Sequence, residues 1–172
     1  MRWLVFLRAV NVGGTGKLPM APLCRALEDA GARDVASWIQ SGNIALTLDQ
    51  PRAEEAAAWV TEEIARAFGF RPPAIALSPD ALRRVIDGMP FPGADPKCLH
   101  AALFQGTAPG DPAALARYCT AGEEIAPGPS CLYLHAPNGL GRSKVPARIE
   151  AALGLPATLR GLTTLRRTLA LA

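Results

Sequence analysis

The order in which apolar runs alternate with helical patterns constrains the fold of this chain more than any other feature. Residues 3–7 (WLVFL) form a continuous apolar run that is typical of a buried strand. A Gly-rich loop follows, and the apolar spacing then predicts a helix that begins at Pro19 and stops at Gly31. Further elements are expected in the same half of the chain: strands at residues 35–40, 44–48 and 74–77, and a helix between Pro51 and Gly69.

The second and third of these strands are expected to form a hairpin. Ser41, Gly42 and Asn43 separate them, and Gly and Asn tolerate the positive φ of a tight turn. The resulting order is β-α-β-β-α-β, which is the split βαβ pattern of a ferredoxin-like domain.

Much of this pattern recurs in the second half. A linking helix at residues 78–90 precedes a strand at residues 99–104, and Asp111 is placed to cap a helix that ends at Gly122. Further along the chain, the sequence predicts a hairpin across residues 127–129, a helix over residues 145–153 and a last amphipathic helix. The predicted fold class is therefore α+β, with two ferredoxin-like (α/β-plait) halves packed together. Residues 1–78 form the first half, and residues 79–172 form the linking helix and a second, degenerate half.

Composition narrows the classes of function. Hydrophobic residues make up 49% of the 172 residues and charged residues 19%, which excludes a disordered chain. The apolar runs are too short for a membrane span, and neither a leader nor membrane association is expected. The four cysteines show no C-x-x-C pair, so we expect no metal site and a cytoplasmic location. A net charge of +3 falls short of a dedicated nucleic-acid binder.

The loop at residues 11–17 (NVGGTGK) is the strongest local pattern for binding. Gly13, Gly14 and Gly16 allow backbone amides to turn toward an anion, at a point where a helix is about to begin. Lys17 adds a full positive charge. The P-loop pattern is not met, because Asn11 and Leu18 stand where it requires Gly and Ser or Thr. The alternative interpretation is a strand-to-helix connection with no ligand.

Topology favours the binding interpretation. In a split βαβ domain, the end of the first strand and the hairpin between the second and third strands lie at the same edge of the sheet. Arg8, which closes the apolar run, and the Gly-rich loop should therefore lie near the hairpin. The hairpin residues that would contribute to a site for a phosphate, a carboxylate or a nucleic-acid backbone are Gln40, Ser41, Gly42 and Asn43. The alternative is that Asn11 and Asn43 only satisfy turn backbones.

A second polar loop precedes the helix expected over residues 145–153. Arg142 and Lys144 lie beside that helix start, where cations would suit an anion. Ser143 is also a natural N-cap, which alone would explain its presence. Ser143 and Lys144 are expected to complete the site from the second half.

These loops together resemble a known family. The runs LRAVNVGGTGKLPM, WIQSGNIAL, PFP and GRSK are similar to the bacterial family called domain of unknown function 1697, nearly end to end. The resemblance implies two ferredoxin-like halves. It also implies that the family's characteristic positions are occupied here by Arg8, Asn11, Gly13, Gly14, Lys17, Gln40, Ser41, Gly42, Asn43, Ser143 and Lys144. The chain departs from the family at Arg160-Gly161-Leu162, where relatives usually show an R-N-W run.

The sequence identifies neither a catalytic residue nor a cofactor, and it leaves the oligomeric state open. His100 and His135 both fall in expected strands, where a core or edge histidine is the better interpretation. Binding of an anionic ligand that contains a phosphate or a nucleotide is the leading hypothesis. A nucleic-acid-associated module and an enzyme that acts on a phosphorylated small substrate are the alternatives.

Overall fold

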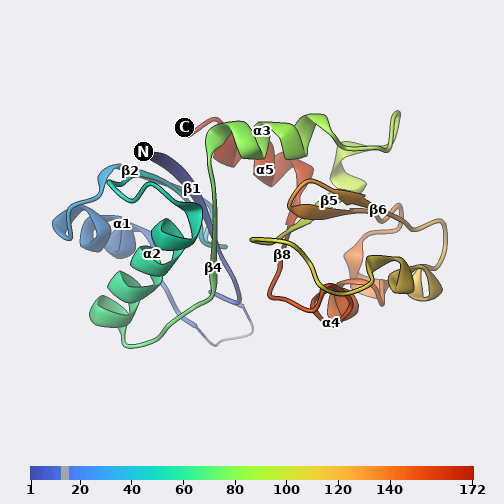
Figure 1. The fold of residues 1–172 in the computed structure, drawn as a ribbon, viewed down its shortest axis with the longest axis horizontal. Helices are drawn as coiled ribbons and strands as arrows, with labels where there is room; N and C mark the ends of the chain where they lie inside the picture. Colours follow the sequence, from blue (N-terminus) through green and yellow to red (C-terminus); the bar gives the residue numbers. More distant parts are fainter. Residues whose placement is uncertain (13–15) are drawn as a thin grey trace. The chain divides into compact units, whose positions relative to one another are not determined.

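The computed structural model describes residues 1–12 and 16–172. These residues divide into two compact units (Figure 1). Unit 1 comprises Met1–Leu82 and Arg167–Ala172, and unit 2 comprises Arg83–Arg166. The division passes through two helices, α3 (Pro79–Asp87) and α5 (Leu162–Leu169).

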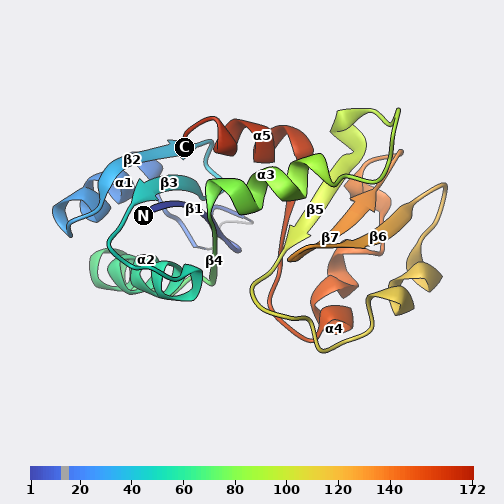
Figure 2. The same ribbon diagram turned by 45° about the horizontal axis from the view of Figure 1, so that its top comes forward.

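Unit 1 is a four-stranded antiparallel sheet with two long helices on one face (Figure 2). Its strands are β1 (Arg2–Leu7), β2 (Arg33–Trp38), β3 (Asn43–Thr47) and β4 (Ala74–Leu77), in the order β2-β3-β1-β4. The helices are α1 (Met20–Asp29) and α2 (Ala53–Phe68). β1 therefore lies at the centre, between β3 and β4, as the split βαβ pattern requires.

The core of unit 1 follows from the alternation of side chains along β1. Val5 and Leu7 point to the same face of the sheet and belong to one buried cluster. Leu23 of α1 and Ile64 of α2 belong to the same cluster, so both helices bury their apolar stripes against this face. Gly69 ends α2 in the left-handed conformation, at a φ of 77°, which is the helix stop that the sequence predicts.

Unit 2 repeats this strand order. Its strands are β5 (Leu99–Leu103), β6 (Glu124–Gly128), β7 (Cys131–His135) and β8 (Thr158–Gly161), in the order β6-β7-β5-β8. The first strand of the unit again pairs with the third and the fourth. The predicted fold class, α+β with two ferredoxin-like halves, is confirmed.

The helices of unit 2 are shorter than predicted. The segment expected to be a helix after Asp111 is a 3-10 helix, η2 (Pro112–Tyr118), whose first turn is capped by the Asp111 carboxylate. The later helix is divided between a 3-10 turn, η4 (Pro146–Arg148), and α4 (Ile149–Leu153). Two further 3-10 turns are η1 (Pro96–Cys98) and η3 (Leu140–Arg142). Strand β8 was missing from the prediction, because it is only four residues long and ends at Gly161, which is too short a pattern to indicate a strand.

None of the described helices has the length and apolar character that crossing a membrane demands.

The burial of His100 in β5 predicts a dependence of stability on pH. This side chain is 9% exposed, and its Nδ1 atom lies 3.2 Å from the carbonyl oxygen of Cys98. Burial disfavours the charged imidazolium and lowers the pKa of His100 below its ordinary value of 6.5. The unfolded chain therefore binds more protons than the folded chain as the pH falls through 6.5, and the free energy of unfolding should decrease.

We expect the free energy of unfolding of His100→Gln to decrease less than that of the wild type between about pH 7.5 and about pH 5.5. Urea unfolding at the two pH values is the measurement. His135→Gln is the matched control and should keep the decrease that His100 causes. An equally steep decrease in the His100 variant would contradict the assignment.

Candidate functional site

The side chain of Asn11 joins the Gly-rich loop to the hairpin. Its Nδ2 atom donates to the carbonyl oxygen of Leu18, at 2.8 Å, and to that of Gln40, at 2.6 Å. Its Oδ1 atom accepts from the backbone nitrogen of Leu18, at 2.8 Å. One amide thus connects the end of β1, the entry to α1 and the turn between β2 and β3. The structure therefore brings the loop and the hairpin together.

Two of the predicted site glycines lie where the backbone approaches other atoms closely. Gly16 has a φ of 61°, and a Cβ atom there would lie 2.8 Å from the carbonyl oxygen of Ala9. Gly42 has a φ of 75°, and a Cβ atom there would lie 2.7 Å from both Leu7 Cβ and Val10 Cγ2. Both positions therefore require glycine for packing as well as for φ.

The hairpin presents its polar side chains in different ways. Asn43 is fully buried, and its Nδ2 atom donates to the Trp38 carbonyl oxygen and to Ser41 Oγ, at 3.1 and 2.9 Å. Asn43 therefore holds the turn in shape. Ser41 is half-buried, and Gln40 is exposed with its carbonyl oxygen engaged by Asn11. Among these residues, the side chain of Gln40 is the best placed to meet a ligand.

The charged residues of the site lie around this framework. Lys17 is exposed and follows Gly16, which packs against Ala9. Arg8 is half-buried at the end of β1, where its backbone nitrogen donates to the Pro73 carbonyl oxygen at 2.8 Å. Helix α1 begins shortly after Lys17, with neither a side-chain cap nor an acidic residue in its first turn. An anion near this helix start would therefore meet no negative side chain from the first turn.

The remaining predicted site residues are placed as follows. Gly13 and Gly14 lie outside the described residues. Ser143 and Lys144 belong to unit 2, so their participation stays a prediction. Ser143 Oγ accepts from the backbone nitrogen of Val145 at 3.2 Å, which is a local turn, and Lys144 is exposed.

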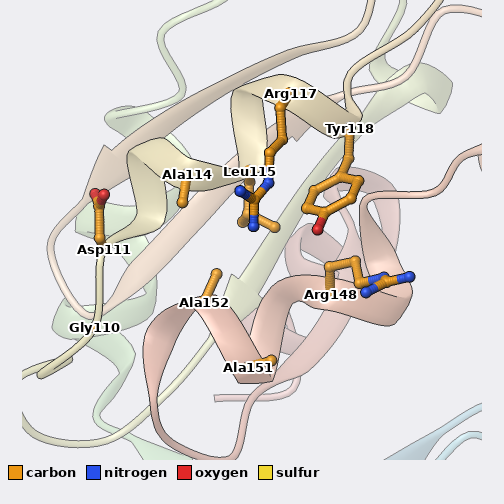
Figure 3. Close-up of a pocket in the computed structure, with 9 residues that line it drawn as sticks. All are labelled: Gly110, Asp111, Ala114, Leu115, Arg117, Tyr118, Arg148, Ala151 and Ala152. Atoms are coloured by element: carbon orange, nitrogen blue, oxygen red, sulfur yellow. The ribbon is translucent and has the colours of Figure 1, made fainter.

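Two of the pockets in unit 2 are lined by charged residues that the sequence did not indicate as a site. One has a volume of about 350 Å³ and lies between η2 and α4, with Arg117, Tyr118 and Arg148 among its lining residues (Figure 3). The other has a volume of about 400 Å³ and is lined in part by His135 and Glu124. His135 Nδ1 lies 3.2 Å from Glu124 Oε1, so this edge histidine has a carboxylate partner on β6.

The described residues contain no cluster of three or more His, Cys, Asp or Glu side chains that is arranged to hold a metal ion. All four cysteines are unbridged. Burial raises the pKa of the Cys131 thiol to about 11, which keeps it protonated at neutral pH. Cys131 therefore behaves as a core residue.

The fold and the site define an α+β protein with two ferredoxin-like halves and a Gly-rich loop held against a hairpin in the first. The chain belongs to the family described as Protein of unknown function (DUF1697), which matches residues 1–133. It is also similar to a solved structure, the conserved bacterial protein SP0830 from Streptococcus pneumoniae. The identity is 20%, the TM-score is 0.67, and the similarity covers 99% of this chain and 97% of that chain. No curated protein matches the sequence.

The contacts of Gly42 predict that Gly42→Ala destabilises the protein more than a change at a glycine in open space. Gly69 is the matched control, because its φ of 77° is close to the 75° of Gly42 and no atom lies within 4 Å of the added Cβ. We expect Gly69→Ala to cost about 1 kcal/mol for the left-handed conformation. Gly42→Ala should cost roughly 1–3 kcal/mol more, because its Cβ overlaps two side chains. Chemical denaturation measures the free energy of unfolding of both variants. Equal decreases in the two variants would show that the added Cβ at position 42 is not crowded.

The three hydrogen bonds of Asn11 predict that Asn11→Ala lowers the free energy of unfolding by about 2–4 kcal/mol. The alanine loses these bonds and must also adopt a φ of 55°. Asn11→Gly loses the bonds alone, so it should be the less destabilised of the two by about 1 kcal/mol. Urea unfolding of both variants is the measurement. If Asn11→Ala is as stable as the wild-type protein, this amide does not hold the loop.

Proposed function

We propose that unit 1 binds an anionic ligand that carries a phosphate, at the surface made by the Gly-rich loop and the β2–β3 hairpin. The observation that carries the proposal is the hydrogen bond from Asn11 to Gln40, because it supports the loop that bears Lys17 against the hairpin. A binding surface made of two loops is specific only if the loops are fixed relative to each other.

The charge of this surface favours an anion. Lys17 is exposed and supplies a mobile ammonium group, which suits phosphate as a point charge. Arg8 is the second basic residue at this end of β1. The nearby start of α1 adds the positive end of a helix dipole.

The residues of the site divide into two groups. Asn11, Gly42 and Asn43 hold the loop and the turn through the contacts described above. Arg8 and Lys17 supply charge, and Gln40 and Ser41 supply polar groups that orient the ligand. The backbone amides of Gly13, Gly14 and Gly16 are assigned as further donors on the sequence pattern. A cytoplasmic location, proposed from the same sequence, is compatible with the four unbridged cysteines.

A thermal-shift experiment on wild type and Lys17→Ala tests the proposal. The panel contains inorganic phosphate, nucleotides, sugar phosphates and short RNA. A ligand present at a hundredfold its Kd stabilises the protein by about 2.7 kcal/mol, or roughly 5–10 °C in Tm for a chain of this size. We expect a rise in Tm for wild type and none for Lys17→Ala. Lys97→Ala is the matched control, since Lys97 is an exposed lysine in the 3-10 turn η1 of unit 2.

The salt dependence of any shift separates the classes of ligand. A small phosphorylated molecule should bind with a weak dependence on salt. An RNA-associated module would instead lose affinity steeply as salt rises, because counterions are released from the nucleic acid. If no phosphate compound raises the Tm and Lys17→Ala melts early, the loop is only a structural connection and the proposal is wrong.

A further inference from the structure

A second candidate site lies entirely within unit 2. It is the pocket of about 350 Å³ between η2 and α4 (Figure 3). Part of its lining is apolar and small, with Leu115 from η2 and Ala151 and Ala152 from α4. Its volume is at the lower end of the range for small-molecule sites.

Two arginines converge on one aromatic ring beside this pocket. The Cζ atom of Arg117 lies 4.9 Å from the centroid of the Tyr118 ring, and that of Arg148 lies 5.0 Å from it. Figure 3 draws the ring between the two arginine side chains, with the Arg117 guanidinium over the gap between η2 and α4. Cation–π contacts of this kind position the guanidinium groups while leaving their N–H donors available.

These positive charges are not neutralised by the protein. In the part of the chain that the structure describes, neither Arg117 nor Arg148 forms an ion pair with a carboxylate. Asp111 is the acidic side chain in the pocket lining, and it accepts a hydrogen bond from the Ala113 backbone nitrogen at 3.0 Å. The lining of the pocket therefore holds two cations and one carboxylate, which is already engaged in capping η2.

We propose that this pocket binds a small phosphate monoester. The Arg117 guanidinium presents a fork of N–H donors that matches phosphate oxygens, and Arg148 adds a second positive charge on the other side of the Tyr118 ring. The contact with Tyr118 restricts the Arg117 side chain before the ligand arrives, so less conformational entropy is lost on binding. The apolar residues Leu115, Ala151 and Ala152 provide a surface for the organic group of the ester. The site uses none of the residues proposed for unit 1, so either site can exist without the other.

Titration with phenyl phosphate, followed by NMR of the full chain, tests this proposal. The Nε–H signals of Arg117 and Arg148 and the amide signal of Tyr118 report on the pocket directly. We expect these signals to move in a saturable way, and we expect no such change with sodium chloride at the same ionic strength. Inorganic phosphate should bind at least several-fold more weakly than the ester, because it makes no contact with the apolar surface.

Three variants show whether the pocket is responsible. Arg117→Gln should weaken phenyl phosphate binding by about tenfold, because it removes charge-assisted hydrogen bonds. Arg148→Gln should weaken it by less, about twofold to fivefold, because it removes only a nearby positive charge. Arg84→Gln is the matched control, since Arg84 is an exposed arginine of unit 2 that does not line the pocket, and it should bind as wild type does. All three positions are exposed, so the folded state should persist, and amide spectra confirm it.

The proposal is overturned if the pocket signals do not move, or if Arg84→Gln weakens binding as much as the pocket variants do. Equal affinity for inorganic phosphate and phenyl phosphate would overturn the assignment of a monoester. The same titration in Lys17→Ala should leave the pocket signals responsive. If the pocket signals no longer respond to phenyl phosphate in Lys17→Ala, the binding belongs to unit 1 instead.

Discussion

The structure of unit 1 at the end of its central strand depends on one side-chain amide, that of Asn11. Where the chain leaves β1, this amide forms hydrogen bonds with backbone groups of two other segments. Beyond β1, which ends at Leu7, the chain leaves the sheet and enters α1 at Met20. Asn11 satisfies both the N–H and the carbonyl of Leu18, and it reaches the hairpin through Gln40. Asparagine suits this position because it tolerates a positive φ, here 55°, and carries a donor and an acceptor on one short side chain. The position of Lys17 follows from this arrangement.

This arrangement separates the residues that build the site from those that can touch a ligand. Asn43 and Gly42 are buried and act on the shape of the hairpin. Lys17 and Gln40 are exposed at the surface that those contacts create. A loop that is fixed by hydrogen bonds loses less conformational entropy when a ligand binds, so structural roles for Asn11 and Asn43 are compatible with binding nearby. The alternative interpretation of these asparagines, as partners of turn backbones, describes their contacts but leaves the exposed charge unexplained.

Sequence patterns predicted most of the fold, and the failures have physical reasons. Apolar periodicity and turn residues predicted all four strands of unit 1 and three of the four in unit 2, because those patterns reflect burial within each half. β8 was missed because it is a short edge strand that contains Arg160, a half-buried cation whose Nη1 atom donates to Thr158 Oγ1 at 2.7 Å. Burial lowers the pKa of Arg160 to about 10, an environment that no local pattern indicates. The pocket at Arg117 and Arg148 was missed because residues far apart in the sequence meet there.

On the two proposals made above, one topology would hold different binding chemistry in the two units. In each unit, the connection from the first strand to the second carries the cation proposed to bind: Lys17 before α1 in unit 1, and Arg117 within η2 in unit 2. A full α-helix in that connection leaves a loop ahead of its N-terminus, where backbone amides are available. A 3-10 helix has its i and i+3 side chains aligned, so binding there falls to side chains such as Arg117 and Tyr118. On these proposals, the form of this one crossover determines whether a ferredoxin-like half would recognise an anion with its backbone or with its arginines.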